Sequence, residues 1–209
     1  MHKKYIWLIG AAALVALTLI ALLISSLFIP HANYGFHTAV SSQEQQLRMQ
    51  VVDTAIRWLG TQGCSDAHKR ILEIYNSHEP LAQGYIVQTE DAWCATFVST
   101  VAIQCGLTDR IPTECGCQRQ IGLWQQLGQW EEADDYIPLP GDIIYYCMAE
   151  SDYFGDCDGH SDHVGIVVGT WGGFIKVIEG NCNNEVAYRY IPINSYQIRG
   201  FGLPKYSES

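Results

Sequence analysis

The sequence predicts an α+β fold in which N-terminal helices pack on an antiparallel β-sheet. In the first half of the chain, between Leu47 and Leu127, apolar residues recur every three or four positions, which is the helical period. From Ile143 onward the pattern changes to short runs rich in β-branched and aromatic residues, which is typical of strands. Helices followed by antiparallel strands indicate an α+β domain. The 209 residues suffice for one such domain and accessory segments.

The N-terminus begins with Lys3 and Lys4, followed by an uncharged run over residues 5–29. About 20 apolar residues cross a bilayer. The run is longer than the apolar core of about 7–15 residues of a cleavable signal peptide, which is the alternative. We therefore expect a cytoplasmic tail (1–4), a transmembrane anchor (5–29), a polar linker (30–45) and a folded domain (46–209). Because lysines stay in the cytoplasm, the expected location is the cell membrane, single-pass, with the domain outside.

The charge balance argues against a nucleic-acid partner. The chain has a net charge of −10, and all 22 acidic but only 10 of the 12 basic residues lie beyond residue 29, which leaves that part at −12. Such a surface repels phosphate backbones and anionic cell-wall polymers.

The helices and strands can be placed in order along the chain. We expect helices at 47–60, 65–76, 92–105 and 121–127, with Asp91 as the N-cap of the third and Gly106 as its stop. Pro140 and Gly141 indicate a break in the chain before the first strand. We expect strands at 143–147, 163–169, 174–179, 186–191 and 198–203.

The third helix places Cys94 in its first turn, where free N–H groups and the helix dipole favour a thiolate. Cys94 is therefore the candidate nucleophile, although a small buried hydrophobe is the alternative reading of any single cysteine. A nucleophilic thiol needs a base, and the base needs an orienting group. Candidates for both occur downstream, in the segments 163–168 and 177–181, which contain His163, Glu179 and Asn181.

Whether His163 meets Glu179 depends on the turn between their strands. Side chains alternate faces along a strand, so the loop length decides which residues share a face. We expect a three-residue loop, 171–173, with Thr170 opposite Phe174 and Gly173 at positive φ. That register pairs His163 with Asn181 and places Glu179 one diagonal step away on the same face.

Five motifs occur in a characteristic order: Gly84-Tyr85, Asp91-x-Trp93-Cys94-Ala95-x-Phe97-Val98, Gly141-Asp142-Ile143, His163-Val164-Gly165-Ile166-Val167 and Glu179-Gly180-Asn181. This pattern resembles the CHAP family (cysteine, histidine-dependent amidohydrolase/peptidase) of the papain-like NlpC superfamily. The resemblance covers most of the chain after about residue 46.

The resemblance implies a papain-like fold with Cys94 as nucleophile, His163 as base, Glu179 as its orienting group and Asn181 as a supporting polar residue. Known members of the family cut peptidoglycan, at the sugar–peptide amide or within the peptide stem, so peptidoglycan is the expected substrate. Two alternatives stay open. One is a catalytically silent module that binds peptidoglycan for an envelope or conjugation (DNA-transfer) machinery, and the other is an acyltransferase of the same fold.

Aromatic residues near these motifs are candidates for substrate contact, because an indole or phenol ring stacks on the apolar faces of sugars and peptides. They are Trp93, Tyr85, Tyr145 and Trp171. Tyr85 is also a candidate second donor to an oxyanion, beside the N–H of Cys94. For Trp93, the core of the domain is the alternative place.

No cofactor is required for this chemistry, but the acidic segment 152–162 raises the question of a metal. Asp152, Asp156 and Asp158 resemble part of a calcium loop, although no glutamate holds the twelfth position. Zinc bound through Cys157 and His160 is another reading, and a solvated acidic insertion is the one we favour.

The eight cysteines indicate some disulfides if the compartment is oxidising. Their connectivity cannot be deduced from sequence, but Cys115 and Cys117 are too close for an unstrained mutual bridge.

Overall fold

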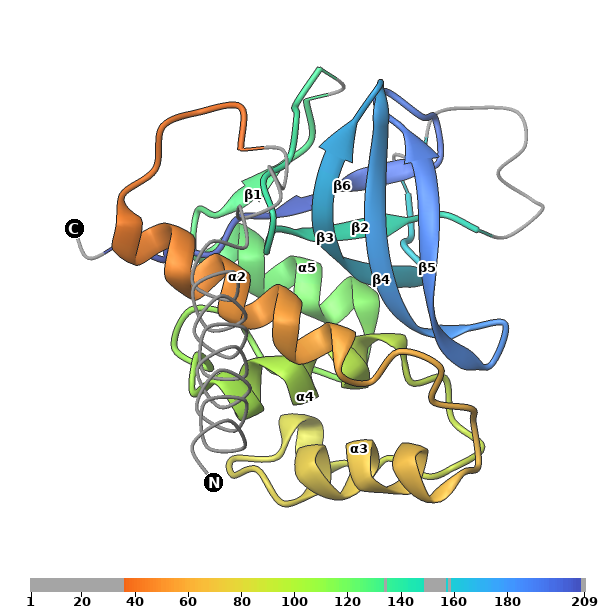
Figure 1. Ribbon diagram of the computed structural model, residues 1–209. Helices are drawn as coiled ribbons and strands as arrows, with labels where there is room; N and C mark the ends of the chain where they lie inside the picture. The colour runs from red at the N-terminus through yellow and green to blue at the C-terminus, as the bar shows by residue number, and fades with distance from the viewer. Residues whose placement is uncertain (1–35, 134, 149–156, 158, 208–209) are drawn as a thin grey trace, which may run out of the picture. The chain divides into compact units, whose positions relative to one another are not determined.

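Six strands form one antiparallel sheet in the order β1-β6-β2-β3-β4-β5 (Figure 1). The computed structural model describes residues 36–133, 135–148, 157 and 159–207, which belong to the second of two structural units, Gly35–Ser209. The strands are β1 (Trp130–Glu131), β2 (Ile143–Tyr146), β3 (His163–Trp171), β4 (Phe174–Cys182), β5 (Glu185–Pro192) and β6 (Ile198–Gly202). β3, β4 and β5 run steeply across β2 and β6 in Figure 1, so the sheet is strongly curled.

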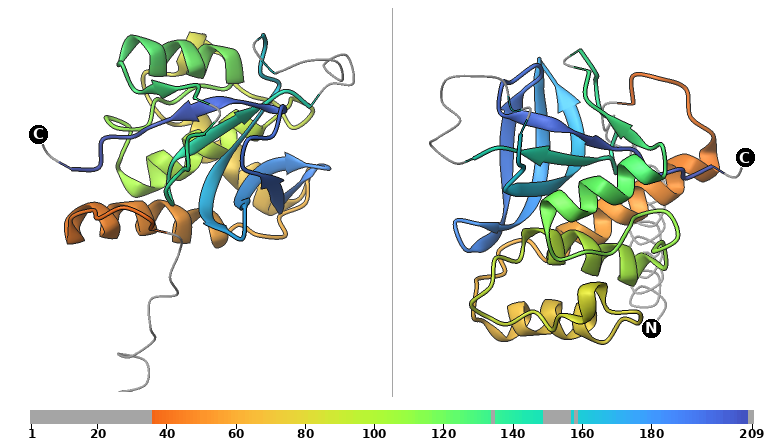
Figure 2. Two further views of the ribbon diagram at one scale, coloured as in Figure 1. Left: turned by 90° about the horizontal axis from the view of Figure 1, so that it is seen from above. Right: turned by 180° about the vertical axis from the view of Figure 1, so that it is seen from behind.

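The helices gather on one side of this sheet, as the view from behind in Figure 2 shows. They are α2 (Ser42–Ile56), α3 (Asp66–Asn76), the 3₁₀-helix η1 (Ala82–Gly84), α4 (Cys94–Cys105) and α5 (Cys117–Gln126). Ser41 and Ser65 cap α2 and α3, each hydroxyl accepting a backbone N–H from the first turn. Gly106 ends α4 at a φ of 67°, the left-handed conformation expected of a C-cap glycine.

Two hydrophobic clusters hold the layers together. The larger one lies between the helices and the sheet and centres on α4, whose buried Phe97, Val98 and Val101 pack among residues of α2, α3, β3 and β4. The smaller one fills the opposite face of the curled sheet, and its members are Ile144, Tyr146, Val167, Ile175, Val177, Ile191 and Phe201. Both faces of the central strands are therefore buried, so β2 is apolar throughout instead of alternating.

The predicted α+β class is what the structure shows, with helices beside an antiparallel sheet. Several boundaries differ from the predicted ones. α2 and α5 begin earlier, at Ser42 and Cys117, and the short strand β1 was not among the predicted strands. The N-cap of α4 is Trp93, because the Asp91 carboxylate instead accepts the N–H of Gln88 and the hydroxyl of Tyr85.

The turn between β3 and β4 also differs from the prediction. It is a two-residue loop, Gly172-Gly173, in which both glycines have positive φ and Trp171 lies opposite Phe174. Such a loop alone would put His163 and Glu179 on opposite faces. A bulge between Val167 and Gly169 shifts the register back, so that Ile166 pairs with Ile178 as the predicted register requires.

The predicted transmembrane helix needs correction. Within the described part of unit Gly35–Ser209, no helix has both the length and the apolar character to cross a bilayer. The anchor was placed at residues 5–29, which lie outside the described residues. The anchor in the predicted fold and the single-pass membrane localisation are therefore withdrawn.

The Gly-Asp-Ile motif has a structural role in this fold. Asp142 is fully buried, and its carboxylate accepts hydrogen bonds from Arg48 Nη1 at 2.8 Å, the Leu139 N–H and the Tyr136 hydroxyl. Because Arg48 belongs to α2, this buried ion pair joins α2 to the start of β2.

Candidate active site

Cys94 is the first residue of α4, and only 4% of its surface is exposed. The N–H groups in the first turn of a helix have no intrahelical acceptor, and they place partial positive charge around this sulfur. Phe97, whose N–H bonds to the Trp93 carbonyl at 2.9 Å, closes the turn behind it. The position is suited to a thiolate, as the sequence predicts.

His163 begins β3 and contacts Glu179 of β4 on the same face of the sheet. The distance between His163 Nε2 and Glu179 Oε2 is 2.9 Å. Gly165 makes this approach feasible, because a Cβ atom there would lie 2.5 Å from Val177 Cγ1 and 2.8 Å from Glu179 Cγ. With Nε2 held by the carboxylate, Nδ1 is the ring nitrogen left to exchange a proton with Cys94.

Arg189 on β5 completes the support of the histidine, and sequence reasoning missed it. Its Nε donates to Glu179 Oε1 at 2.6 Å, so each carboxylate oxygen has its own cationic partner. Arg189 lies opposite Val177, one diagonal step from Glu179. The signal that could have found it is the turn Asn183-Asn184, where both residues take positive φ and set the β4–β5 register.

Charge and hydrogen bonding bias this group of residues toward a thiolate–imidazolium pair. A hydrogen bond from Cys117 lowers the pKa of Cys94 well below that of a free thiol, and although burial opposes this, His163 lowers the pKa further. Burial alone would lower the pKa of His163, but Cys94 and Glu179 outweigh it and raise that pKa to about 9. Burial would also favour neutral Glu179, yet His163 and Arg189 keep its pKa below the ordinary value.

Cys117 is a second site residue that sequence reasoning did not assign. It is the first residue of α5, and its Sγ lies 3.6 Å from Cys94 Sγ. The neighbouring thiolate, through its hydrogen bond first and its charge as well, raises the pKa of Cys117. Because His163 acts on Cys94, we assign Cys94 as the thiolate that accepts and Cys117 as the thiol that donates. Cys115 faces Glu114 instead, so the two cysteines have different partners.

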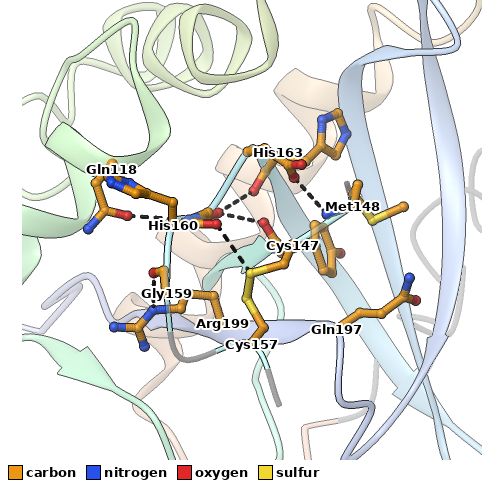
Figure 3. Close-up of a disulfide and its surroundings, with 12 residues drawn as sticks. Gln118, Cys147, Met148, Cys157, Gly159, His160, His163, Gln197 and Arg199 are labelled. Atoms are coloured by element: carbon orange, nitrogen blue, oxygen red, sulfur yellow. Dashed lines mark hydrogen bonds between the residues drawn. A yellow bond between two sulfur atoms is a disulfide. The ribbon is translucent and has the colours of Figure 1, made fainter. Parts of the chain in front are cut away.

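The residues just before His163 are held by a disulfide and by polar contacts (Figure 3). Cys147 and Cys157 are bonded, and Cys147 Sγ lies 3.3 Å from the His160 carbonyl oxygen. Ser161 donates its hydroxyl to the Tyr146 carbonyl, and its N–H bonds to Gln118 of α5. The Tyr146 ring stacks on the His163 imidazole at a centroid distance of 6.2 Å. These contacts define where β3 begins and how His163 is oriented.

The aromatic residues predicted to contact substrate differ in exposure. Trp93 and Tyr145 are buried, at 1% and 0% exposure. Trp93 packs on His68 and Phe97, while the Tyr145 hydroxyl donates to Gln120. Trp171 is exposed but ends β3, the opposite end from His163. Tyr85 is half-exposed, and its hydroxyl donates a hydrogen bond to the Asp91 carboxylate.

Asn181 lies in an irregular stretch of β4 between the pairs that Glu179 and Cys182 make with β5. Its φ of 57° is left-handed, a conformation that asparagine tolerates better than most residues. Since Glu179 already occupies the Nε2 atom of His163, the position of Asn181 suits a bend of the backbone more than a hydrogen bond to the imidazole.

The metal predictions fall partly outside the described residues. Asp152, Asp156 and Asp158, the candidate calcium ligands, lie outside the residues that the structure describes. The zinc alternative needs correction, because Cys157 is bonded to Cys147 and has no thiolate to offer. Among the residues that the structure describes, no cluster of three or more His, Cys, Asp or Glu side chains is placed to hold a metal ion.

Comparisons with known proteins add little. No protein-family model matches this chain, and no curated protein does. Two similar solved structures are the crystal structure of Ly7917 and the crystal structure of Ly7917 with the hydrolyzing product of MDP. Each is 16% identical with a TM-score of 0.38, and the match covers 75% of this chain and 62% of the other, less than two thirds of its length. Similarity at this level carries no argument about fold or function.

Proposed function

We propose that this protein is a cysteine-dependent amidohydrolase that cleaves an amide bond of peptidoglycan. The observation that carries the proposal is the His163–Glu179 pair, 2.9 Å apart, beside a cysteine at a helix N-terminus. A binding module has no need of a nucleophile, a base and an orienting carboxylate in one place. The substrate class rests on the resemblance of the motifs to the CHAP family, whose known members cut peptidoglycan.

In the first step, the Cys94 thiolate attacks the carbonyl carbon of the amide. Negative charge develops on the carbonyl oxygen, and the backbone N–H groups at the start of α4 are the donors that stabilise it. His163, protonated at neutral pH because its pKa is about 9, gives its Nδ1 proton to the leaving amine. The C–N bond breaks and leaves an acyl group on Cys94.

In the second step, the now neutral imidazole takes a proton from water, and the hydroxide formed attacks the thioester. Release of the acid restores the thiolate. Glu179 keeps the imidazole in one orientation through both steps, and Arg189 keeps Glu179 ionised although it is fully buried.

The test is digestion of purified peptidoglycan by the full-length chain, followed by mass spectrometry of the released fragments. We expect new termini that identify one amide, either between muramic acid and the first alanine or within the peptide stem. Cys94→Ala protein with an unchanged circular dichroism spectrum is the control and should release none. Fragments released equally by wild type and Cys94→Ala would refute the proposal.

A further inference from the structure

The first residues of two different helices bring two cysteine sulfurs together in the candidate active site. Cys94 begins α4, Cys117 begins α5, and their sulfur atoms are 3.6 Å apart. A disulfide bond is about 2.05 Å long, so the sulfurs need to approach by only ~1.5 Å, a shift within reach of side-chain rotation. Amide hydrolysis does not require the Cys117 sulfur to react, because there Cys117 only donates a hydrogen bond to Cys94.

Buried hydrogen bonds hold Cys117 in this position. Ser99 of α4, which is fully buried, donates its hydroxyl to the Glu114 carbonyl at 2.7 Å and accepts the Glu114 N–H at 2.9 Å. Gln120 of α5 donates to the Pro112 carbonyl at 2.7 Å. Between these anchors lies Gly116, where an added Cβ atom would meet only Arg119 Cδ, at 3.9 Å, so no side chain packs closely on the residue before Cys117.

We propose that Cys94 and Cys117 form a reversible disulfide, which makes the site a dithiol that a hydroperoxide oxidises and a thiol reductant restores. The inference rests on the proposed function only in its consequence: the disulfide occupies the nucleophile, so the oxidised protein is inactive. The bond itself follows from the geometry whether or not the substrate is peptidoglycan.

The oxidation balances in two steps. The Cys94 thiolate attacks one oxygen of hydrogen peroxide, the O–O bond breaks, and the departing hydroxide takes the proton of the His163 imidazolium to become water. Cys94 is then a sulfenic acid. The Cys117 sulfur attacks the Cys94 sulfur, the S–O bond breaks, and the departing hydroxide leaves as water with the Cys117 proton. Two electrons from the pair of sulfurs reduce one peroxide to two waters.

The two cysteines have unequal parts in this reaction. Cys94 attacks first, because the neighbouring His163 favours its thiolate. Cys117, 3.6 Å away, then stays a thiol next to a negative charge. Once Cys94 is a neutral sulfenic acid, that charge is gone and Cys117 can ionise and attack. Only 4% of Cys94 is exposed, which favours a small oxidant such as hydrogen peroxide over a bulky disulfide.

The experiment is disulfide mapping of the full-length wild-type chain after exposure to hydrogen peroxide. The protein is alkylated, digested without reduction and analysed by mass spectrometry. We expect a peptide pair joined through Cys94 and Cys117, together with loss of Cys94 alkylation that dithiothreitol restores. The Cys147–Cys157 bond gives a separate peptide pair, so its reduction is recognised.

Two variants make the test specific. In Cys117→Ser we expect no linked pair, and prolonged peroxide should drive Cys94 to a sulfinic acid that dithiothreitol does not reverse. In the matched control Cys115→Ser, which changes the cysteine two residues away, the Cys94–Cys117 pair should still form. Wild-type protein in which Cys94 reaches sulfinic acid while Cys117 stays alkylatable, or in which Cys94 pairs with any other cysteine, would overturn the proposal. None of these readouts requires peptidoglycan cleavage.

Discussion

Arg189 donates from Nε to Oε1 of Glu179 at 2.6 Å, and this contact leaves Oε2 for His163. Loss of the guanidinium removes a cation beside a fully buried carboxylate, so the pKa of Glu179 should rise. A carboxylate whose pKa is lowered in the folded state is ionised above that pKa, and it loses its charge and its support of His163 as the pH falls through that pKa.

We therefore expect Arg189→Met to move the acidic limb of the activity profile to higher pH, by about one unit or more. Arg189→Lys keeps the charge and should restore part of the shift. Arg70→Met, which removes an exposed pair with Glu73, is the control and should behave as wild type. Identical acidic limbs in Arg189→Met and wild type would show that Arg189 does not position Glu179.

Glu179 is expected to orient His163 and not to attack substrate. Glu179→Gln keeps the shape but loses the charge that helps raise the pKa of His163 to about 9. The imidazolium should then lose its proton at lower pH, and the alkaline limb of hydrolysis should move down from about 9. We expect slower turnover in Glu179→Gln and a larger loss in Glu179→Ala, measured as rates of peptidoglycan solubilisation between pH 6 and 10. If both variants match wild type, the orienting role passes to another group.

The register of β3 against β4 shows how far the sequence could predict this site. Alternation along the strands correctly placed His163 and Glu179 on one face, and the residue types led to Cys94 as the candidate nucleophile. The predicted loop length was wrong. His163 and Glu179 still share a face because a bulge at Val168, which no feature of the local sequence indicates, compensates for the shorter turn. Arg189 was missed because its place depends on the β4–β5 register, which the Asn183-Asn184 turn and the irregular stretch between Glu179 and Cys182 set. Cys117 was missed because no capping side chain marks the start of α5.

Gly165 should be intolerant of any side chain. An alanine Cβ there would lie 2.5 Å from Val177 Cγ1 and 2.8 Å from Glu179 Cγ, so Glu179 must shift away from His163. We expect Gly165→Ala to cost roughly 1–3 kcal/mol of unfolding free energy and most of the hydrolytic rate. Gly122→Ala in α5, where no atom lies within 4 Å of the new Cβ, is the control and should be neutral or stabilising. Urea unfolding of both variants tests this, and equal midpoints would contradict it.

Trp93 should act through the core. It is 1% exposed, and its ring packs on His68 at a centroid distance of 4.5 Å. Removing a buried indole costs about 3–5 kcal/mol, which corresponds to roughly 10 °C in Tm for a chain of this size. In Trp93→Ala we expect hydrolysis and Cys94 alkylation to fall together. Unchanged Tm with a selective loss of peptidoglycan cleavage would instead assign Trp93 to substrate binding.

The most direct test of the activated nucleophile is the pH dependence of Cys94 alkylation by iodoacetamide, quantified by mass spectrometry of the Cys94 peptide. A free thiol with a pKa of about 8.5 gains reactivity by more than ~100-fold between pH 6 and 9. Because the pKa of Cys94 lies well below that of a free thiol, the wild-type rate should be nearly flat over this range, and in His163→Ala it should rise with pH. A wild-type profile that rises with a midpoint near 8.5 and does not change in His163→Ala would contradict the assignment of Cys94 and His163 as a thiolate–imidazolium pair.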